Sequence, residues 1–414
     1  MREDLDLLMK QNDISALWVS GSLKHNPDMV YFTGIHNVAG ADLIKKVGRP
    51  PILYITSQME REEGEKSGLE TYMLDEKYPL TKYLEVAKGD IAQAYAKRLR
   101  DVLIDSGLSN ARIAIFGKNP INQMKSILDH LSVLMPDSKF IGFFKDSPIE
   151  QARMTKDAEE IQHIRKMGKI TTKVVERTKN FLTSQKVLDG YLVDEEGQPL
   201  RIKDVKKRIQ LWLAELGADN PKETIFAIGR DAGIPHSAGN PEDQIELGKS
   251  IVFDIFPCET GGGYFYDFTR TWCLGFASQE IIDVHRQVLS VHHQLIDELE
   301  ADSPYSIYQK KTCALFKEMG HQTIEDSFTT KEGYVHSIGH GLGLDVHENP
   351  FSGITSTKGD TLSEGVVFTI EPGLYYPSKG FGVRIEDTIV LNNNGQFKIL
   401  ADYPYDLVLP MKVH

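Results

Sequence analysis

Cysteine is scarce in this sequence, with three residues among 414: Cys258, Cys273 and Cys313. They form no CxxC pair and no even-numbered framework, which excludes a disulfide scaffold and indicates reduced, mostly structural thiols. Cys258 and Cys273 lie on neighbouring expected strands, so a disulfide between them stays open as the minor alternative. A reducing compartment is therefore expected.

Long apolar runs and excess positive charge are missing as well. No apolar stretch approaches the ~20 residues that a membrane helix requires, and the opening segment MREDLDLLMKQND is too acidic for a signal peptide. The net charge of −12 disfavours non-specific binding to nucleic-acid phosphates, and the basic face of an expected helix at 201–218 is interpreted as solvated surface. These absences predict a cytoplasmic protein that binds neither membranes nor nucleic acid.

The chain is long enough for two domains, and its 41% hydrophobic content is typical of a globular protein. Residues 1–150 alternate between strand-like and helix-like segments, which predicts a smaller α/β domain. Its expected strands are 15–20, 28–34, 50–56 and 111–117, and its expected helices are 58–66, 89–106 and 121–134. A boundary is expected within 146–160, followed by a long helix to about residue 182.

Four carboxylates stand in apolar, strand-like runs of the second region, 151–414. They are Asp254 in IVFDIF, Asp267 in YFYDFTRTW, Glu371 in VVFTIEPG and Glu386 in GVRIEDTIVL. Acidic side chains are rarely buried unless they are paired or bound to metal. Two expected strand pairs, at 251–273 and 366–391, could each present two acids to one point, where two divalent cations would neutralise four carboxylates. For any one of these acids alone, a hydrogen-bonded structural role is the competing interpretation.

A histidine-rich segment, HSIGHGLGLDVH, lies between the two strand pairs. His336, His340 and His347 recur at spacings of four and seven, among four glycines between positions 333 and 343. Small neighbours let the His340 ring approach a crowded centre. Oxygen-rich coordination with one imidazole suits manganese, iron or cobalt, and two metals roughly 3.5–4 Å apart can hold a nucleophilic hydroxide.

The ordered set of four acids and His340 resembles that of the pita-bread-fold dinuclear metallopeptidases. The motifs GHGLGLDVHE, TIEPGLY and VRIEDTIVL are similar to the Xaa-Pro dipeptidase (prolidase) and aminopeptidase P branch, over about residues 156–411. Before that, MVYFTG is the one recognisable motif. The resemblance implies an α+β fold: a pita-bread catalytic domain with a curved, mainly antiparallel sheet at 151–414, after an α/β domain at 1–150 with a substrate-pocket or dimer role.

The resemblance also implies a role for each matched residue. The expected metal ligands are Asp254, Asp267, His340, Glu371 and Glu386, with Asp267 and Glu386 bridging. Glu371 would also be the general base. The expected substrate-binding residues are His236, His347, Arg384 and His336, of which His236 and His347 would stabilise the tetrahedral intermediate.

Two of these roles have alternatives. His236 could be an ordinary loop histidine. Arg384 shares a strand face with Glu386 and could form an ion pair that steadies that acid, which is compatible with orienting the site or meeting a substrate carboxylate.

The implied function is hydrolysis of peptide bonds that precede proline. The enzyme would be a homodimer and would use two divalent ions. Manganese is the expected metal, with cobalt, iron and zinc as alternatives. An inactive pita-bread scaffold and a metal-free creatinase-like amidinohydrolase are the competing hypotheses, and both are disfavoured by the five retained ligands. Two departures from the family pattern are the 13-residue separation of Asp254 and Asp267 and the presence of Phe256 after the first acid. The sequence leaves open whether the product side accepts only free proline or a longer peptide.

Overall fold

The computed structural model describes residues 4–353, 356–357 and 359–412. The chain divides into two compact units, Met1–Arg153 with Gly261–Gly263 and Met154–Thr260 with Tyr264–His414. Among the described residues, no helix is both long enough and apolar enough to cross a membrane.

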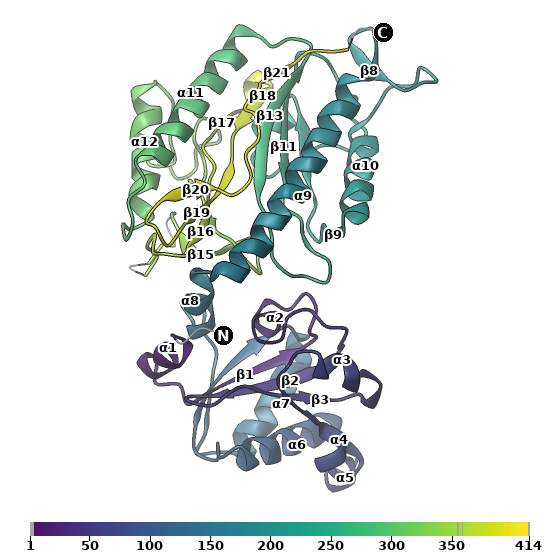
Figure 1. The fold of residues 1–414 in the computed structure, drawn as a ribbon, viewed down its shortest axis with the longest axis vertical. Coiled ribbons are helices and arrows are strands. Elements are labelled where there is room, and N and C mark those ends of the chain that lie inside the picture. Colours follow the sequence, from purple (N-terminus) through teal and green to yellow (C-terminus); the bar gives the residue numbers. More distant parts are fainter. Residues whose placement is uncertain (1–3, 354–355, 358, 413–414) are drawn as a thin grey trace. The chain divides into compact units, whose positions relative to one another are not determined.

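The first unit is built on a six-stranded mixed sheet in the order β4-β3-β2-β1-β5-β6. Strand β1 pairs in parallel with β5 and antiparallel with β2. The strands are β1 (Ala16–Gly21), β2 (Ala41–Lys46), β3 (Ile52–Ile55), β4 (Glu70–Met73), β5 (Arg112–Gly117) and β6 (Lys139–Ile141). The helices are α1 (Leu5–Gln11), α2 (Pro27–Thr33), α3 (Arg61–Glu65), α4 (Leu74–Lys77), α5 (Leu80–Val86), α6 (Ile91–Asp105), α7 (Ile121–Leu134) and α8 (Pro148–Met154). Figure 1 shows this unit in purple and blue.

The strand expected at 28–34 is wrong, because these residues form helix α2. Pro27 occupies the first turn, where its missing N–H costs no hydrogen bond. The buried residues Met29, Val30 and Phe32 follow a helical spacing that the aromatic content of MVYF obscures. Gly34, with φ of +70°, then ends the helix.

The second unit begins with the long helix α9 (Ala158–Thr183). Asp157 caps it by accepting hydrogen bonds from the backbone N–H groups of Glu159 and Glu160, and the Glu160 side chain accepts from the Asp157 N–H in return. A hairpin of β7 (Lys186–Leu188) and β8 (Tyr191–Val193) follows, then helix α10 (Ile202–Glu215). The remaining helices are α11 (Gln279–Asp297) and α12 (Ser306–Glu318).

Two mainly antiparallel sheets form the centre of this unit. The first has the order β10-β11-β13-β21 and the second β15-β14-β16-β19-β20. Their strands are β10 (Ile225–Ile228), β11 (Ser250–Ile255), β13 (Phe268–Leu274), β14 (His340–Gly341), β15 (Glu348–Phe351), β16 (Val367–Ile370), β19 (Asp387–Leu391), β20 (Phe397–Ile399) and β21 (Val408–Leu409). Two shorter pairs join β9 (Ala218–Asp219) to β12 (Cys258–Glu259) and β17 (Gly373–Tyr376) to β18 (Phe381–Arg384).

The two sheets meet at Thr269 and Glu386. The Glu386 N–H donates to the Thr269 carbonyl at 3.1 Å, and the two residues form an isolated antiparallel bridge. Both expected strand pairs form: β11 pairs with β13, and β16 pairs with β19. The β17–β18 hairpin interrupts the second pair. The three cysteines are buried and none of them forms a disulfide, so the Cys258–Cys273 disulfide is absent.

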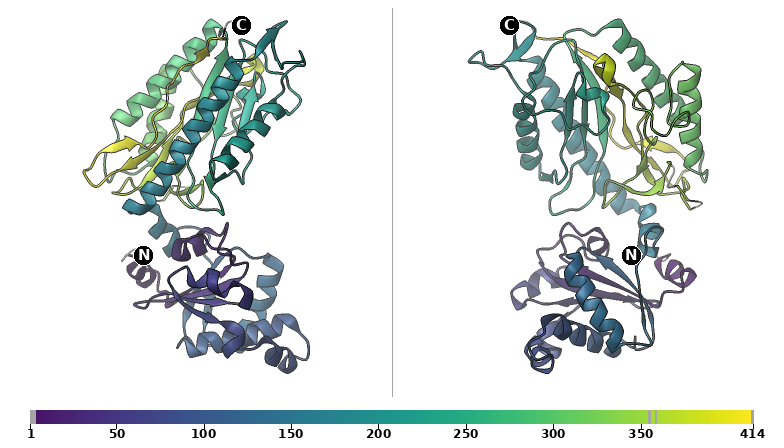
Figure 2. Two further views of the ribbon diagram at one scale, coloured as in Figure 1. Left: turned by 45° about the vertical axis from the view of Figure 1, so that its right-hand side comes forward. Right: turned by 180° about the vertical axis from the view of Figure 1, so that it is seen from behind.

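Each sheet packs mainly against its own pair of helices, although the first core also includes Val367 and Val390 of the second sheet. Residues of α9 and α10 pack with those of β10, β11 and β13, whereas α11 and α12 pack with β16, β18 and β19. In Figure 1 the two helix pairs flank the strands on opposite sides, and the views in Figure 2 agree. This arrangement leaves the joint between the sheets as the place where polar side chains converge.

Candidate metal centre

The four acids stand at or beside the joint between the sheets. Asp254 lies within β11, whereas Asp267 directly precedes β13, Glu371 directly follows β16 and Glu386 directly precedes β19. All four acids were expected within strand-like runs, and three of them lie directly beside the end of a strand. At a strand end the backbone leaves the ladder, which lets the side chains of both sheets turn towards one point.

The longer turn between Asp254 and Asp267 preserves the face that each acid occupies. Asp254 is the direct cross-strand partner of Thr269, and Asp267 lies two residues before Thr269 along the chain. Because strand side chains alternate, these positions share one side of the sheet. Strand β12 lies in the turn, and Phe256 packs partly buried against the first core.

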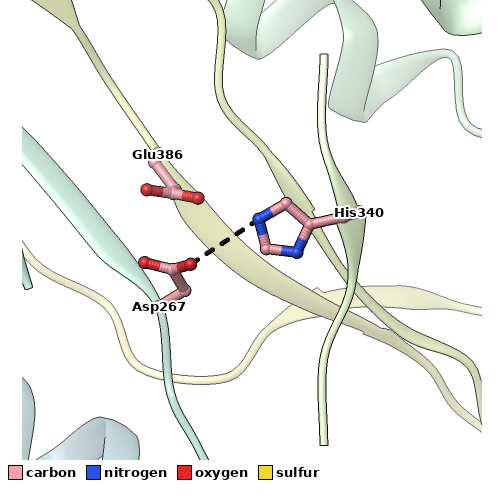
Figure 3. A group of neighbouring side chains, drawn as sticks. All are labelled: Asp267, His340 and Glu386. Carbon is pink, nitrogen blue, oxygen red and sulfur yellow. Dashed lines mark ion pairs between the residues drawn. The ribbon is translucent and has the colours of Figure 1, made fainter. Parts of the chain in front are cut away.

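Asp267, His340 and Glu386 each offer one ligand atom, and these atoms all lie within 4.8 Å of one another. Figure 3 shows the two carboxylates and the imidazole turned towards a common point. The Nε2 atom of His340 is 3.7 Å from Oδ2 of Asp267. All three side chains are buried.

Glu371 and Asp254 complete the group. Oε1 of Glu371 lies 3.5 Å from Nε2 of His340. Oδ2 of Asp254 accepts a hydrogen bond from Nη2 of Arg384 at 2.5 Å, while its buried Oδ1 has no hydrogen-bond partner among the described residues. An unpartnered carboxylate oxygen beside other acids fits a cation ligand.

The imidazole of His340 presents an unprotonated nitrogen to the acids. Its Nδ1 lies 3.0 Å from the carbonyl oxygen of Gly341, so Nδ1–H donates there and the Nε2 lone pair is left facing Asp267 and Glu371. Burial, followed by the nearby His347, lowers the pKa of His340 to about 3. A neutral ring does not neutralise the carboxylates of Asp267 and Glu371 that face it.

Close backbone packing explains the glycines that flank His340. A Cβ atom on Gly339 would stand 2.2 Å from the carbonyl oxygen of Thr369, and one on Gly341 would stand 2.1 Å from that of Asn349. Strand β14 therefore lies too close to its neighbours for any side chain at these two positions. The glycines allow the approach that puts the His340 ring into the site.

The pKa values of three of the acids are raised, because these side chains are buried close to one another. Burial, then Asp254 and Glu371, raise the pKa of Asp267 well above its ordinary range. Burial, then Asp267 and Glu371, do the same for Glu386, and burial raises the pKa of Glu371 to about 8. Such a group ionises readily only beside cations, so the residues present fit divalent metal ions bound by oxygen atoms and one imidazole.

Arg384 does not pair with Glu386 in the way its strand position indicated. Its guanidinium donates from Nη2 to Asp254, and from Nη1 to the Tyr375 hydroxyl at 2.8 Å and to the Pro235 carbonyl at 3.1 Å. The reason is geometric: Glu386 lies beyond the end of β18, at the bridge to Thr269.

Tyr375 and Thr269 contact residues of the site, but the sequence predicted no role for either of them. The Tyr375 hydroxyl is 2.8 Å from Nε2 of His336, whose Nδ1 donates to the Ser337 carbonyl at 2.7 Å. Thr269 donates from Oγ1 to Oε2 of Glu386 at 2.7 Å. The two-residue spacing between Thr269 and Asp267 indicated that both side chains lie on one face of a strand. No local pattern in the sequence marked Tyr375 as a site residue.

The remaining histidines lie around this group. The rings of His340 and His347 meet edge to face at 4.3 Å between centroids, and burial lowers the pKa of His347 to about 4. Nδ1 of His336 is 3.9 Å from Oε2 of Glu371. His236 lies exposed in the turn at 234–237, and besides burial it contributes to the lowered pKa values of His336 and His347.

Comparison with known proteins gives a consistent result. Residues 162–393 match metallopeptidase family M24. An Xaa-Pro dipeptidase of Pyrococcus furiosus is 25% identical over 404 residues, which cover 95% of this chain and 97% of that protein. A dipeptidase structure from Pyrococcus horikoshii superposes with a TM-score of 0.74 at 23% identity, covering 98% of this chain and 99% of that one.

An X-Pro aminopeptidase structure from Thermotoga maritima superposes with a TM-score of 0.73, with the same coverage and 23% identity. The fold is thus shared over both units, and the sheets and helices described above are those of the pita-bread architecture. The family match spans more than half of the chain and contains all five expected ligands. The chain therefore belongs to metallopeptidase family M24 and is a metallopeptidase.

Proposed function

We propose that this enzyme hydrolyses Xaa-Pro peptide bonds at a centre of two divalent metal ions, with manganese as the working metal. The observation that carries the proposal is the convergence of one neutral imidazole and several buried carboxylates at the joint of two sheets. The proposed ligands are Asp254, Asp267, His340, Glu371 and Glu386, with Asp267 and Glu386 bridging.

The proline specificity is supported by the relatives. Proteins with 97% and 94% of their length covered by this chain are named Xaa-Pro dipeptidases, and a structural neighbour is named an X-Pro aminopeptidase. Both activities cleave the same tertiary amide, which lacks an N–H and is constrained at φ. The substrate is thus a peptide with proline in second position.

Glu371 is the proposed proton carrier. When bound, the divalent ions would polarise the scissile carbonyl and lower the pKa of the attacking water. The Glu371 carboxylate would take the proton from that water and deliver it to the proline nitrogen, which has to be protonated before it can leave. Its position between His340 and His336 keeps it at the centre of the site.

His347 and His236 are the proposed substrate-binding groups. His347 is neutral at physiological pH because burial holds its pKa at about 4, so it can donate one hydrogen bond to the developing oxyanion without carrying charge. His236 lies within electrostatic reach of the same ring. His336 would contribute indirectly, by its hydrogen bond with the Tyr375 hydroxyl.

Arg384 is proposed to orient the site rather than to bind a substrate carboxylate. Its guanidinium is buried, and its N–H groups are directed to Asp254, Thr269, Tyr375 and Pro235. This leaves little capacity for a ligand. The arginine would hold Oδ2 of Asp254 so that Oδ1 is free for metal.

The organisation of the whole molecule follows the same proposal. Residues 151–414 would form the catalytic domain, and residues 1–150 an N-terminal domain that serves the substrate pocket or a dimer interface. We propose a cytoplasmic homodimer.

Metal removal and restoration test the proposal. The protein is stripped with a chelator, its metal content is measured by mass spectrometry, and hydrolysis of Ala-Pro and of a longer peptide beginning Ala-Pro is followed with added manganese. We expect no activity in the stripped enzyme and recovery with about two manganese ions per chain. Turnover of Ala-Pro alone indicates a dipeptidase, and turnover of the longer peptide indicates an aminopeptidase. Full activity without metal, or no turnover of either substrate with manganese, cobalt, iron or zinc, would contradict it.

A further inference from the structure

The first unit contains a cavity of about 830 Å³ that the proposed peptidase chemistry does not use. Its volume lies within the range of ligand pockets, roughly 300–1,000 Å³. It opens where β1, β3 and β5 end, and helices α6 and α7 form its opposite wall. Crevices outside the carboxyl ends of strands are the usual ligand sites of such sheets.

Strand register explains why this cavity has a polar floor. Tyr54, Asp42, Ser20 and Gly117 are direct neighbours across β3, β2, β1 and β5, so their positions share one face of the sheet. Ile52, Ile44 and Trp18 form the next row on that face, and they are apolar. Among the described residues that line the cavity, Asp42 is the single carboxylate, and it lies one row beyond the apolar residues on this face of the sheet.

Two side chains of β1, those of Trp18 and Ser20, hydrogen-bond the Asp42 carboxylate. Trp18 donates from Nε1 to Oδ1 of Asp42 at 2.7 Å. Burial raises the pKa of Asp42, and the hydrogen bonds from Trp18 and Ser20 and the charge of Arg98 offset this desolvation only in part.

The other charged residues that line the cavity form no ion pair with Asp42 among the described residues. Among the described residues that line the cavity, Arg98 and Lys118 are also charged. Arg98 pairs with Asp75 at 3.1 Å and lies over the Tyr95 ring, and Lys118 is exposed to solvent.

The walls are aromatic and aliphatic. Trp18, Tyr54, Leu74, Leu99 and Val102 are buried core residues that also line the cavity, and Tyr95 stands more exposed. Aromatic faces beside a carboxylate are the chemistry that recognises organic cations. We propose that this cavity binds a small amphipathic amine, with its ammonium group against Asp42 and its apolar body against Trp18 and Tyr54.

The three tryptophans of the chain permit a site-specific test in the intact enzyme. Trp18 lies in the first unit, and Trp212 and Trp272 lie in the second. Fluorine NMR of protein labelled with 5-fluorotryptophan, assigned with Trp18→Phe, is recorded during titration with phenethylamine, 2-phenylethanol or 3-phenylpropionate. We expect the amine to shift the Trp18 signal saturably and to bind at least about tenfold more tightly than the neutral or anionic probe.

Two variants and one control sharpen the result. Asp42→Asn keeps an acceptor for Trp18 and should weaken amine binding at least about tenfold. Ala92→Leu adds bulk to the lining of the cavity on α6 and should weaken all three probes alike. Asp129→Asn, which removes an exposed acid of α7 outside the lining, should change nothing.

Several outcomes would overturn the proposal. Equal affinity for the three probes would mean an apolar cavity without charge selection. Preference for the propionate would assign the recognition to Arg98 or Lys118. No shift of the Trp18 signal at millimolar amine, or an Ala92→Leu variant with unchanged affinity, would show that the amine does not enter this cavity.

Discussion

Asp267 combines two contacts that explain its position in the site. Its Oδ1 accepts a hydrogen bond from the Phe268 N–H at 3.0 Å, which fixes the side chain, and its Oδ2 faces His340. Because burial and neighbouring acids raise its pKa, its charge is costly unless a cation is present. The residue is therefore held in a geometry that metal would stabilise.

Asp267→Asn is expected to lose bound metal and at least about a hundredfold of activity, since removal of a ligand costs more than removal of its hydrogen-bond partners. The fold should survive, because an amide has nearly the same shape and retains the Phe268 contact. Metal content by mass spectrometry and circular dichroism measure the two effects. Asp297→Asn, at the exposed end of α11, is the control. Unchanged metal content would refute the assignment of Asp267.

Arg270 has a different function at the same scale. Its Nη1 donates to the carbonyls of Thr269 and Glu386 at 3.0 and 2.9 Å, the two residues where the sheets join. Its Nη2 pairs with Asp387 at 2.8 Å, and both side chains are buried. One guanidinium thus binds the backbone of both sheets directly beside the candidate metal centre.

Arg270→Gln is expected to lower the free energy of unfolding by about 3–5 kcal/mol, because the buried Asp387 carboxylate loses its guanidinium partner and keeps the weaker contacts with Tyr405 and His292. Manganese affinity should fall as well, since Glu386 loses its backbone support. Urea denaturation and metal titration measure these effects, with Arg286→Gln on the exposed face of α11 as the matched control. Equal stability of the two variants would show that the joint does not depend on Arg270.

Strand β14 is the element that brings an imidazole to the acids. It lies between β15 and β16 and is two residues long, and its pairing with β15 shifts register between His340 and Gly341. At Gly339 and Gly341, backbone oxygen atoms of neighbouring segments occupy the space that a side chain would need. Close packing of β14 against its neighbours therefore places His340 in the candidate metal centre.

Gly341→Ala should destabilise the protein by about 1–3 kcal/mol, because the added methyl group meets the backbone oxygen of Asn349, which cannot rotate away. The shift of β14 should also move His340 and weaken metal binding. Thermal unfolding and manganese titration are the measurements. Gly142→Ala, where nothing lies within 4 Å of the new Cβ, is the control and should behave as wild type.

The elements also differ in how well the sequence predicted them. Helix 121–134 is confirmed at both ends as α7, because its apolar residues repeat with helical spacing. The segment 28–34 was predicted as a strand and is α2. In a seven-residue helix, the β-forming character of Val30, Tyr31 and Phe32 is offset by burial of one face, and local propensity does not include that burial.

At the scale of the whole molecule, buried histidines couple stability to pH. His285 is buried in α11, and burial, followed by Arg270, lowers its pKa to about 4 from an ordinary value of 6.5. Between these two values the unfolded chain binds more protons than the folded one. Stability therefore rises with pH through this window and falls on acidification.

His285→Gln is expected to flatten the pH dependence of unfolding between pH 6.5 and 4, where the wild-type histidine costs up to about 3 kcal/mol. Urea denaturation across this range is the measurement, made on metal-free protein so that ligand protonation in the site affects both proteins equally. His293→Gln removes the exposed neighbour on the same helix and should leave the slope unchanged. Identical slopes for wild type and His285→Gln would contradict the assignment.

The sequence by itself determined the residue types and most of the elements: acids embedded in apolar runs, a glycine-flanked histidine, and an acidic chain without a membrane-spanning run. These features are local, since they depend on spacing and on the nature of neighbouring residues. Only the tertiary structure decided that Arg384 pairs with Asp254, that Thr269 and Arg270 join the two sheets, and that Asp42 lies at the floor of a cavity. These contacts depend on the register and ends of strands far apart in the chain, and no local pattern encodes the point at which two sheets meet.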